Sequence, residues 1–268
     1  MKSNKVKSFS ASFILGILML QMPLGSSAAL ISHVHQIDLY GDSVLLGTHE
    51  GLMKLGKSKS FIQVGKASFD VMGLATTEKV IYASGHPLPG DPRPSLLGLL
   101  ASKDGGFTWG QVSLKGSADF HLLVASPHAI AGGDSASGNL FFSTDNGINW
   151  VNRGKNIFED IALSPTSSKV AFGISEEKLL KSNNSLKTWK REKVSGKLSN
   201  VVWANESIYL SSGSELLISR DAGKTWKRLY RFSGTIGALM ANSKLVAATV
   251  GNDIYQSRDG GASFELRK

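Results

Sequence analysis

The chain has 268 residues and no cysteine, and its 30 basic residues outnumber its 21 acidic residues, which gives a formal net charge of +9. The lack of cysteine excludes disulfides, thiol catalysis and thiolate metal sites. The basic residues are scattered among acids and form no stripe with interleaved aromatic residues, so we expect no nucleic acid partner.

The first 29 residues have the layout of a secretory signal peptide. Three lysines precede the apolar stretch 13–20, and the small residues at 26–29 offer a cleavage site. This stretch is shorter than the roughly 20 residues that a membrane span requires, and no second one follows. We therefore expect a mature chain, residues 30–268, that is secreted or extracytoplasmic and has no transmembrane segment. Retention of the leader as an anchor is the alternative.

Short alternating runs separated by turns continue through the rest of the chain. Residues 33–65 hold four of them, with "GKSKS" as the last turn. Five further units follow, each opening with an apolar run, and these runs lie at 70–76, 119–126, 159–165, 199–205 and 235–242. A long insertion, "SGHPLPGDPRPSLLGLL", interrupts the second unit, and its prolines favour an ordered loop over a strand. This loop is the candidate lid.

Each of the five later units contains a copy of one eight-residue segment, between its expected third and fourth strands. The copies are "SKDGGFTW" (102–109), "STDNGINW" (143–150), "SNNSLKTW" (182–189), "SRDAGKTW" (219–226) and "SRDGGASF" (257–264), at spacings of 37–41 residues. A Gly-containing turn between alternating runs predicts a β-hairpin. A period near 40 predicts a repeat architecture, here an all-β, six-bladed β-propeller with four-stranded blades, the first of which lacks the segment. The tryptophans should pack between neighbouring blades.

The five copies resemble the Asp-box (BNR) repeat, S-x-D-x-G-x-T-W, of sialidase-type and related β-propellers. The whole mature chain is similar to small secreted bacterial Asp-box propellers that are labelled sialidase-like or glycosyl hydrolase. In that family the boxes are structural, so the resemblance implies no catalytic role for their acids. The copy at 182–189 departs from the pattern, with Asn184 for the Asp and Leu186 for the second Gly, and we expect its turn to be looser.

Enzymatic activity is an open question at the level of the sequence, and we lean against it. A sialidase would need three arginines on inner strands, and only Arg93, in the insertion, is well placed. We therefore expect no sialidase activity. A glycan-active hydrolase is the alternative function, with Asp70, Asp119 or Glu159 as catalytic carboxylates, since each opens the inner strand of its blade.

The inner strands of the first three blades carry an unusual set of polar residues. Residues i and i+2 share a face of a strand, which brings H-x-H, D-x-M and D-x-H to one sector of the axis. We predict a transition-metal site at the channel mouth, at which at least three of four histidines converge on one point. Its candidate ligands are His33, His35, Met72, His86, His121 and Asp119.

Imidazoles suit copper, zinc or nickel, and the Met72 thioether would favour copper(I). Asp70 and Asp119 are expected to orient the histidines. His49 and His128 are interpreted as turn and surface residues, and the alternative for the whole set is that the histidines are core residues. The predicted function is a secreted, non-enzymatic binding or assembly module for an unknown protein or glycan, monomeric or weakly oligomeric.

Overall fold

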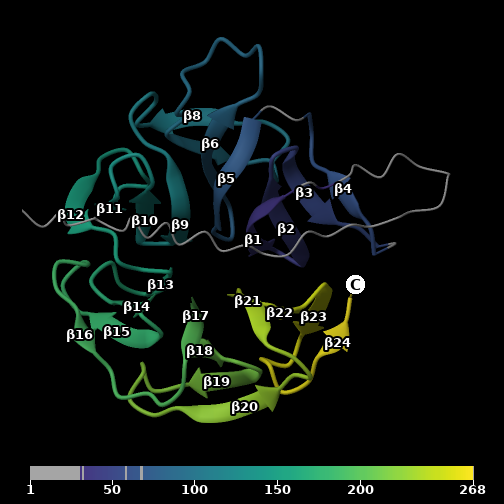
Figure 1. Ribbon diagram of the computed structural model, residues 1–268, viewed down its shortest axis with the longest axis vertical. Coiled ribbons are helices and arrows are strands. Elements are labelled where there is room, and N and C mark those ends of the chain that lie inside the picture. Colours follow the sequence, from purple (N-terminus) through teal and green to yellow (C-terminus); the bar gives the residue numbers. More distant parts are fainter. Residues whose placement is uncertain (1–30, 32, 58, 67–68, 268) are drawn as a thin grey trace, which may run out of the picture.

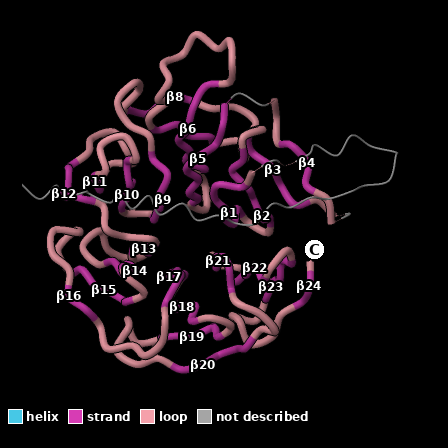
Figure 2. Tube along the Cα trace, in the orientation of Figure 1, coloured by secondary structure: helices cyan, strands magenta, loops and turns pink. Residues whose placement is uncertain are grey.

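The computed structural model describes residues 31, 33–57, 59–66 and 69–267, and within them the chain is all β, with 24 strands and no helix. The strands form six four-stranded antiparallel sheets set around a central axis (Figures 1 and 2). Each innermost strand contacts the innermost strand of the next sheet, and the last contacts the first. This confirms the predicted six-bladed β-propeller.

The four strands of each blade follow one another in the chain, from the axis outward. Blades 1–3 consist of β1 (Val34–Tyr40), β2 (Ser43–Thr48), β3 (Gly51–Leu55), β4 (Phe61–Gln63), β5 (Phe69–Thr76), β6 (Ile81–Pro87), β7 (Leu99–Ser102), β8 (Gly110–Ser113), β9 (Phe120–Ser126), β10 (Ala129–Asp134), β11 (Asn139–Ser143) and β12 (Val151–Lys155). Blades 4–6 consist of β13 (Asp160–Leu163), β14 (Ala171–Ser175), β15 (Lys178–Ser182), β16 (Lys190–Arg191), β17 (Leu198–Ala204), β18 (Ser207–Ser212), β19 (Glu215–Ser219), β20 (Lys227–Arg231), β21 (Ile236–Ala241), β22 (Val246–Val250), β23 (Asp253–Ser257) and β24 (Glu265–Leu266).

The repeated eight-residue segment forms the turn between the third and fourth strands of blades 2–6. In the first copy, the Ser102 hydroxyl donates to Asp104 Oδ1 (2.8 Å) and accepts from the Gly106 amide (2.8 Å). The amide and hydroxyl of Thr108 donate to the two carboxylate oxygens. These hydrogen bonds lower the pKa of Asp104 to about 2. Both carboxylate oxygens of Asp104 are therefore engaged in hydrogen bonds within the turn.

The deviating copy at 182–189 keeps three of these hydrogen bonds at slightly longer distances and reverses the fourth, in which Asn184 Nδ2 donates to the Thr188 hydroxyl (2.8 Å), so the turn retains its hydrogen-bonded form. Asn184 Oδ1 accepts from the Ser182 hydroxyl (3.1 Å) and the Thr188 amide (3.0 Å). Leu186 occupies the glycine position with φ of 65° and is buried. A left-handed conformation is strained for leucine, and burial of its side chain compensates for that strain.

Aromatic side chains fill the junctions between blades. Trp109 contacts Phe69 edge to face, with ring centroids 5.3 Å apart, and both pack on residues of blades 1 and 2. Trp150, Trp189 and Trp226 occupy the following three junctions in the same way, which confirms their predicted place between neighbouring sheets. The last junction, between blades 6 and 1, buries apolar residues of both blades and closes the ring without exchanging a strand.

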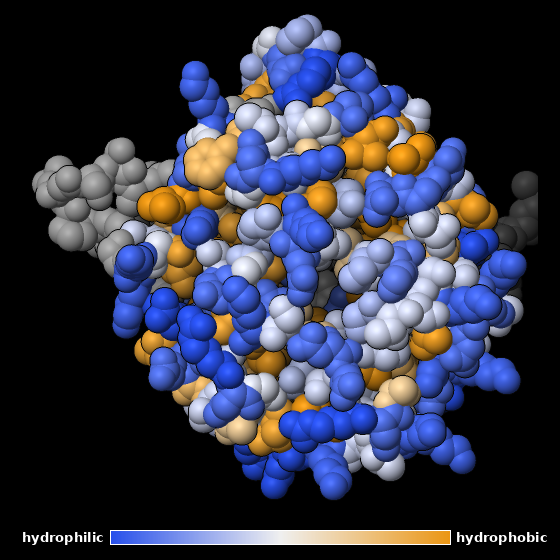
Figure 3. Space-filling view, turned by 180° about the vertical axis from the view of Figure 1, so that it is seen from behind, coloured by the Kyte–Doolittle hydropathy of each residue, from blue (hydrophilic) through white to orange (hydrophobic). Residues whose placement is uncertain are grey.

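The insertion between β6 and β7 projects outward beyond blade 2 at the top of Figure 1. The face turned away from the viewer in Figure 1 carries mainly hydrophilic side chains, with hydrophobic ones in small separate groups (Figure 3). None of the described residues belongs to a helix long and apolar enough to cross a bilayer. The candidate leader, residues 1–29, lies outside the described residues.

Two aspartates on inner strands connect neighbouring blades. Asp38 Oδ2 accepts from the Thr76 amide of blade 2, and Asp160 Oδ2 accepts from the Val201 amide of blade 5, both at 2.8 Å. Burial raises the pKa of Asp38 to about 6 and that of Asp160 to about 7, although backbone hydrogen bonds oppose the shift. Both side chains are therefore partly protonated near neutral pH.

We expect the protein to be more stable at pH 5 than at pH 8 through these two groups. A carboxyl whose pKa is higher in the folded state holds its proton more tightly there, so stability rises as pH falls through that pKa. One pKa unit corresponds to about 1.4 kcal/mol. Because Asp160 retains partial exposure, its share should be about 2 kcal/mol. Asp160→Asn should remove that share from the pH dependence of urea unfolding, whereas Asp253→Asn, at an exposed position, should not. Equal pH dependence in the wild type and Asp160→Asn would contradict this assignment.

Candidate functional site

The inner strands of blades 1–3 are interrupted by β-bulges at the same relative position. His35 in β1, Met72 in β5 and His121 in β9 each lack a partner in the register with the second strand, while the residues on either side are paired. A bulge inserts one residue and re-aims the side chains around it. The regular i, i+2 alternation that placed these residues on one face therefore does not hold through them.

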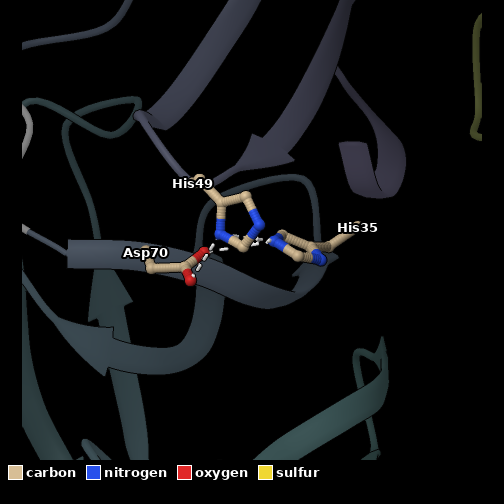
Figure 4. A group of neighbouring side chains, drawn as sticks. All are labelled: His35, His49 and Asp70. Atoms are coloured by element: carbon tan, nitrogen blue, oxygen red, sulfur yellow. Dashed lines mark hydrogen bonds and ion pairs between the residues drawn. The ribbon is translucent and has the colours of Figure 1, made fainter. Parts of the chain in front are cut away.

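The first polar group lies at the junction of blades 1 and 2 and contains His35, His49 and Asp70 (Figure 4). His35 lies on β1, His49 lies in the turn between β2 and β3, and Asp70 lies on β5. Nε2 of His35 lies 3.2 Å from Nδ1 of His49 and 3.2 Å from Oδ1 of Asp70. Nδ1 of His49 lies 2.8 Å from Oδ2 of Asp70.

A third imidazole borders this first group. The ring of His33 lies 4.7 Å from that of His35 and 5.5 Å from that of His49, centroid to centroid. Burial and the nearby His35 and His49 lower the pKa of His33. Burial of Asp70 would raise its pKa, but contacts with His35 and His49 outweigh this and lower it. The group thus combines an ionised carboxylate with a neutral imidazole beside it at neutral pH.

The second polar group lies at the junction of blades 2 and 3 and contains His86, Asp119 and His121. His86 lies on β6, Asp119 lies directly before β9, and His121 is the second residue of β9. Nε2 of His86 lies 3.3 Å from Oδ1 of Asp119, and Nε2 of His121 lies 2.9 Å from Oδ2. The Asp119 side chain is only 8 % exposed, whereas that of His121 is 45 % exposed. The carboxylate is therefore buried beneath two accessible rings.

The partner of Nδ1 indicates which ring nitrogen of His86 carries a proton when the ring is neutral. Nδ1 of His86 lies 2.9 Å from the carbonyl oxygen of Ser95 in the insertion, and a carbonyl can only accept, so Nδ1 carries a proton. In a neutral imidazole Nε2 is then a lone pair. In that neutral form the lone pair would face Asp119 Oδ1, a buried oxygen that accepts no hydrogen bond, whereas a protonated His86 would form an ion pair with it. Two lone pairs at this distance repel unless a proton or a metal cation lies between them.

The structure thus divides the predicted ligands between two groups, which corrects the expectation of one point of convergence. His33 and His35 lie at the first group, and His86, Asp119 and His121 form the second. Met72 is the bulged residue of β5, two positions after Asp70.

His49 was missed as a ligand candidate because it was assigned to a turn. The turn assignment is correct, but the turn faces the inner strand of the next blade. The sequence features that pointed to a polar group at this junction were the H-x-H of blade 1 and the Asp at the beginning of blade 2. His128, by contrast, is exposed in the turn between β9 and β10.

The residues considered for hydrolysis are engaged in other contacts. Contacts with His121 and Ser135 outweigh burial and lower the pKa of Asp119, as the histidine contacts do for Asp70. A general acid in glycoside hydrolysis needs a raised pKa. Glu159 is exposed and accepts from the Glu176 amide. Arg93 binds Asp91 through its side chain, two residues earlier in the same loop.

Comparisons with known proteins support the fold and leave the family open. No protein-family model matches the chain, and no curated protein sequence matches it. Solved structures resemble it at low sequence identity, which shows the fold alone. YCF48 bound to a D1 peptide is 16% identical with a TM-score of 0.52, over 86% of this chain and 80% of that one.

Two further solved structures show how varied the neighbours are. A chain of the nidogen–laminin complex is 11% identical with a TM-score of 0.59, over 84% of this chain and 92% of that one. The GH74 enzyme of Niastella koreensis is 17% identical with a TM-score of 0.58, over 87% of this chain but only 37% of the enzyme. The class that the fold defines is therefore the β-propellers, which include binding proteins and glycoside hydrolases.

Proposed function

We propose that this protein is a secreted, non-enzymatic binding module that holds a transition metal ion on blades 1–3 of its propeller. The observation that carries the proposal is the contact between His86 and Asp119. A metal ion between His86 Nε2 and Asp119 Oδ1 would replace the repulsion of two facing lone pairs with two coordinate bonds. His86 already donates its other N–H to a backbone carbonyl, which is the usual arrangement of a metal-ligating histidine.

The donor set favours some metals over others. Two imidazoles and one carboxylate suit zinc(II), copper(II) or iron(II), and three protein ligands leave an open coordination position. A preference for copper(I) would require the Met72 thioether as a further ligand. Secretion, inferred from the leader, would keep the site away from competing cytosolic thiols.

A second part of the proposal concerns the class of β-propeller to which the chain belongs. We infer that the five repeated turns are Asp-box turns, on the basis of their sequence pattern and their shared hydrogen bonds. Their acidic side chains accept hydrogen bonds within the turns, which supports a structural role for these turns. A functional site is then expected on the inner strands. YCF48 with its D1 peptide and the nidogen–laminin complex are examples of propeller-containing structures with a bound partner. A protein or glycan partner of this chain could bind beside the metal.

Isothermal titration of the purified protein with Zn²⁺ and Cu²⁺ tests the metal proposal. His86→Ala should weaken binding of the affected ion at least tenfold, because it removes one of three ligands. His128→Ala removes an exposed histidine outside both groups and should leave affinity unchanged. If neither ion binds the wild type, or if the two variants bind alike, the proposal is wrong and the contact is an ion pair of a protonated His86.

A further inference from the structure

The two polar groups are built on the same plan at consecutive blade junctions. In each, an aspartate at the beginning of an inner strand contacts two histidine nitrogens; in the first group both histidines come from the preceding blade, and in the second group one does. In each, a bulged residue, His35 or His121, supplies one ring. The plan is shared even though the second histidine comes from a turn in one group and from a strand in the other.

The distances in the first group are close to those between ligands of one ion. His35 Nε2 lies 3.2 Å from His49 Nδ1 and 3.2 Å from Asp70 Oδ1, and one ligand atom from each of the three residues lies within 4.8 Å of the others. Ligands at about 2.0–2.1 Å from a tetrahedral metal lie about 3.3 Å from one another. In addition, Asp70 Oδ1 is buried and has no hydrogen-bond partner, although it faces the His35 ring. The group is thus compact and has an unsatisfied carboxylate oxygen at its centre.

The two groups are joined through one cross-strand pair. Asp70 of the first group and His86 of the second are direct partners in the register of β5 and β6. Asp70 contacts His35 and His49 of blade 1, whereas His86 contacts Asp119 of blade 3. Because the Cα atoms of cross-strand partners are about 5 Å apart, ions in the two groups would lie on the order of 10 Å apart.

We propose that the chain binds two metal ions side by side, one held by His35, His49 and Asp70 and the other by His86, Asp119 and His121. This rests on the proposed function for the second ion only, because the first group has its own ligands. Each ion bridges two blades, so the pair ties blades 1, 2 and 3 together. Metal binding then stiffens one half of the ring.

Counting bound zinc tests the stoichiometry. After equilibrium dialysis against Zn²⁺ and elemental analysis, the wild type and His128→Ala should each hold two ions per chain. His49→Ala and His86→Ala should each hold one, and the double variant none. His49 is half-exposed in a turn, so its replacement should not disturb the fold. Because binding to the folded state raises stability, saturating Zn²⁺ should raise Tm more in the wild type than in either single variant.

The outcomes separate the two proposals. One ion in the wild type, retained in His49→Ala and lost in His86→Ala, would overturn the second site and leave the proposed function standing. One ion retained in His86→Ala and lost in His49→Ala would refute the site at blades 2 and 3 and keep the one at blades 1 and 2. With Cu²⁺ as the probe, dipolar broadening of the EPR spectrum in the wild type but in neither single variant would support two neighbouring ions. Its absence at two bound ions would overturn their placement side by side.

Discussion

Phe120→Ala is expected to lower the free energy of unfolding by about 3–5 kcal/mol. Phe120 is fully buried, and its ring packs against Trp150, with centroids 4.9 Å apart, and against Phe141. It belongs to the core between blades 2 and 3, where Gly132 leaves room for it. Alanine would leave a cavity that rigid neighbouring sheets cannot fill. Urea unfolding of the purified variant measures the loss.

Phe107→Ala is the matched control for this prediction. Phe107 is 66 % exposed, so its truncation should change the free energy of unfolding by no more than about 0.5 kcal/mol. Phe120 also lies between Asp119 and His121, so its loss should loosen the second polar group as well. A similar cost for the two substitutions would show that the junction of blades 2 and 3 is not packed as described.

Gly85→Ala is expected to destabilise the protein by about 3 kcal/mol or more, because the structure has no room for a side chain there. A Cβ at this position would overlap the carbonyl oxygen of Asp70 on the paired strand. Gly85 is paired with Val71, next to the bulge at Met72, where the backbones of β5 and β6 come unusually close. Relief of the overlap would separate the two strands that carry Asp70 and His86.

The effect of Gly85→Ala should appear in both stability and metal binding. Gly110→Ala is the control, since a Cβ there would meet nothing closer than the Ala101 carbonyl oxygen at 3.9 Å. Thermal unfolding and zinc titration of the two variants give the comparison. If Gly85→Ala has the same Tm as Gly110→Ala and still binds both zinc ions, then β5 and β6 are not held together as closely as described.

The repeated turns could be predicted because their determinants are local. The Ser, Asp, Gly and Thr of the first copy bond one another within eight residues, and the equivalent residues of the other copies do the same, so the pattern alone specifies a hairpin. The spacing of the copies then specifies the blade length, and the chain length specifies six blades. Even the deviating copy follows, since Asn184 offers the same acceptor oxygen as an aspartate.

The candidate site could be predicted only in part. The sequence indicated polar inner strands in blades 1–3 and named five of the six residues in the two groups as candidate ligands or their carboxylate partners. The prediction from the sequence assumed regular strands. A bulge such as that at Met72 arises because one strand has one residue more than its paired strand, and the pattern of residue types does not show this. The buried acids Asp38 and Asp160 were also missed, because their pKa values depend on burial and on amides of the next blade.

By itself, the sequence determined the elements whose interactions stay within one blade, namely the hairpins, the repeat and the number of blades. The tertiary structure decided which side chains meet across blade junctions. His49 meets Asp70 because blade 2 packs beside the β2–β3 turn of blade 1. The cross-strand pair of Asp70 and His86 sends its two side chains to opposite junctions, and therefore two groups form where one was expected. Contacts of this kind arise from packing between sheets, which no local pattern encodes.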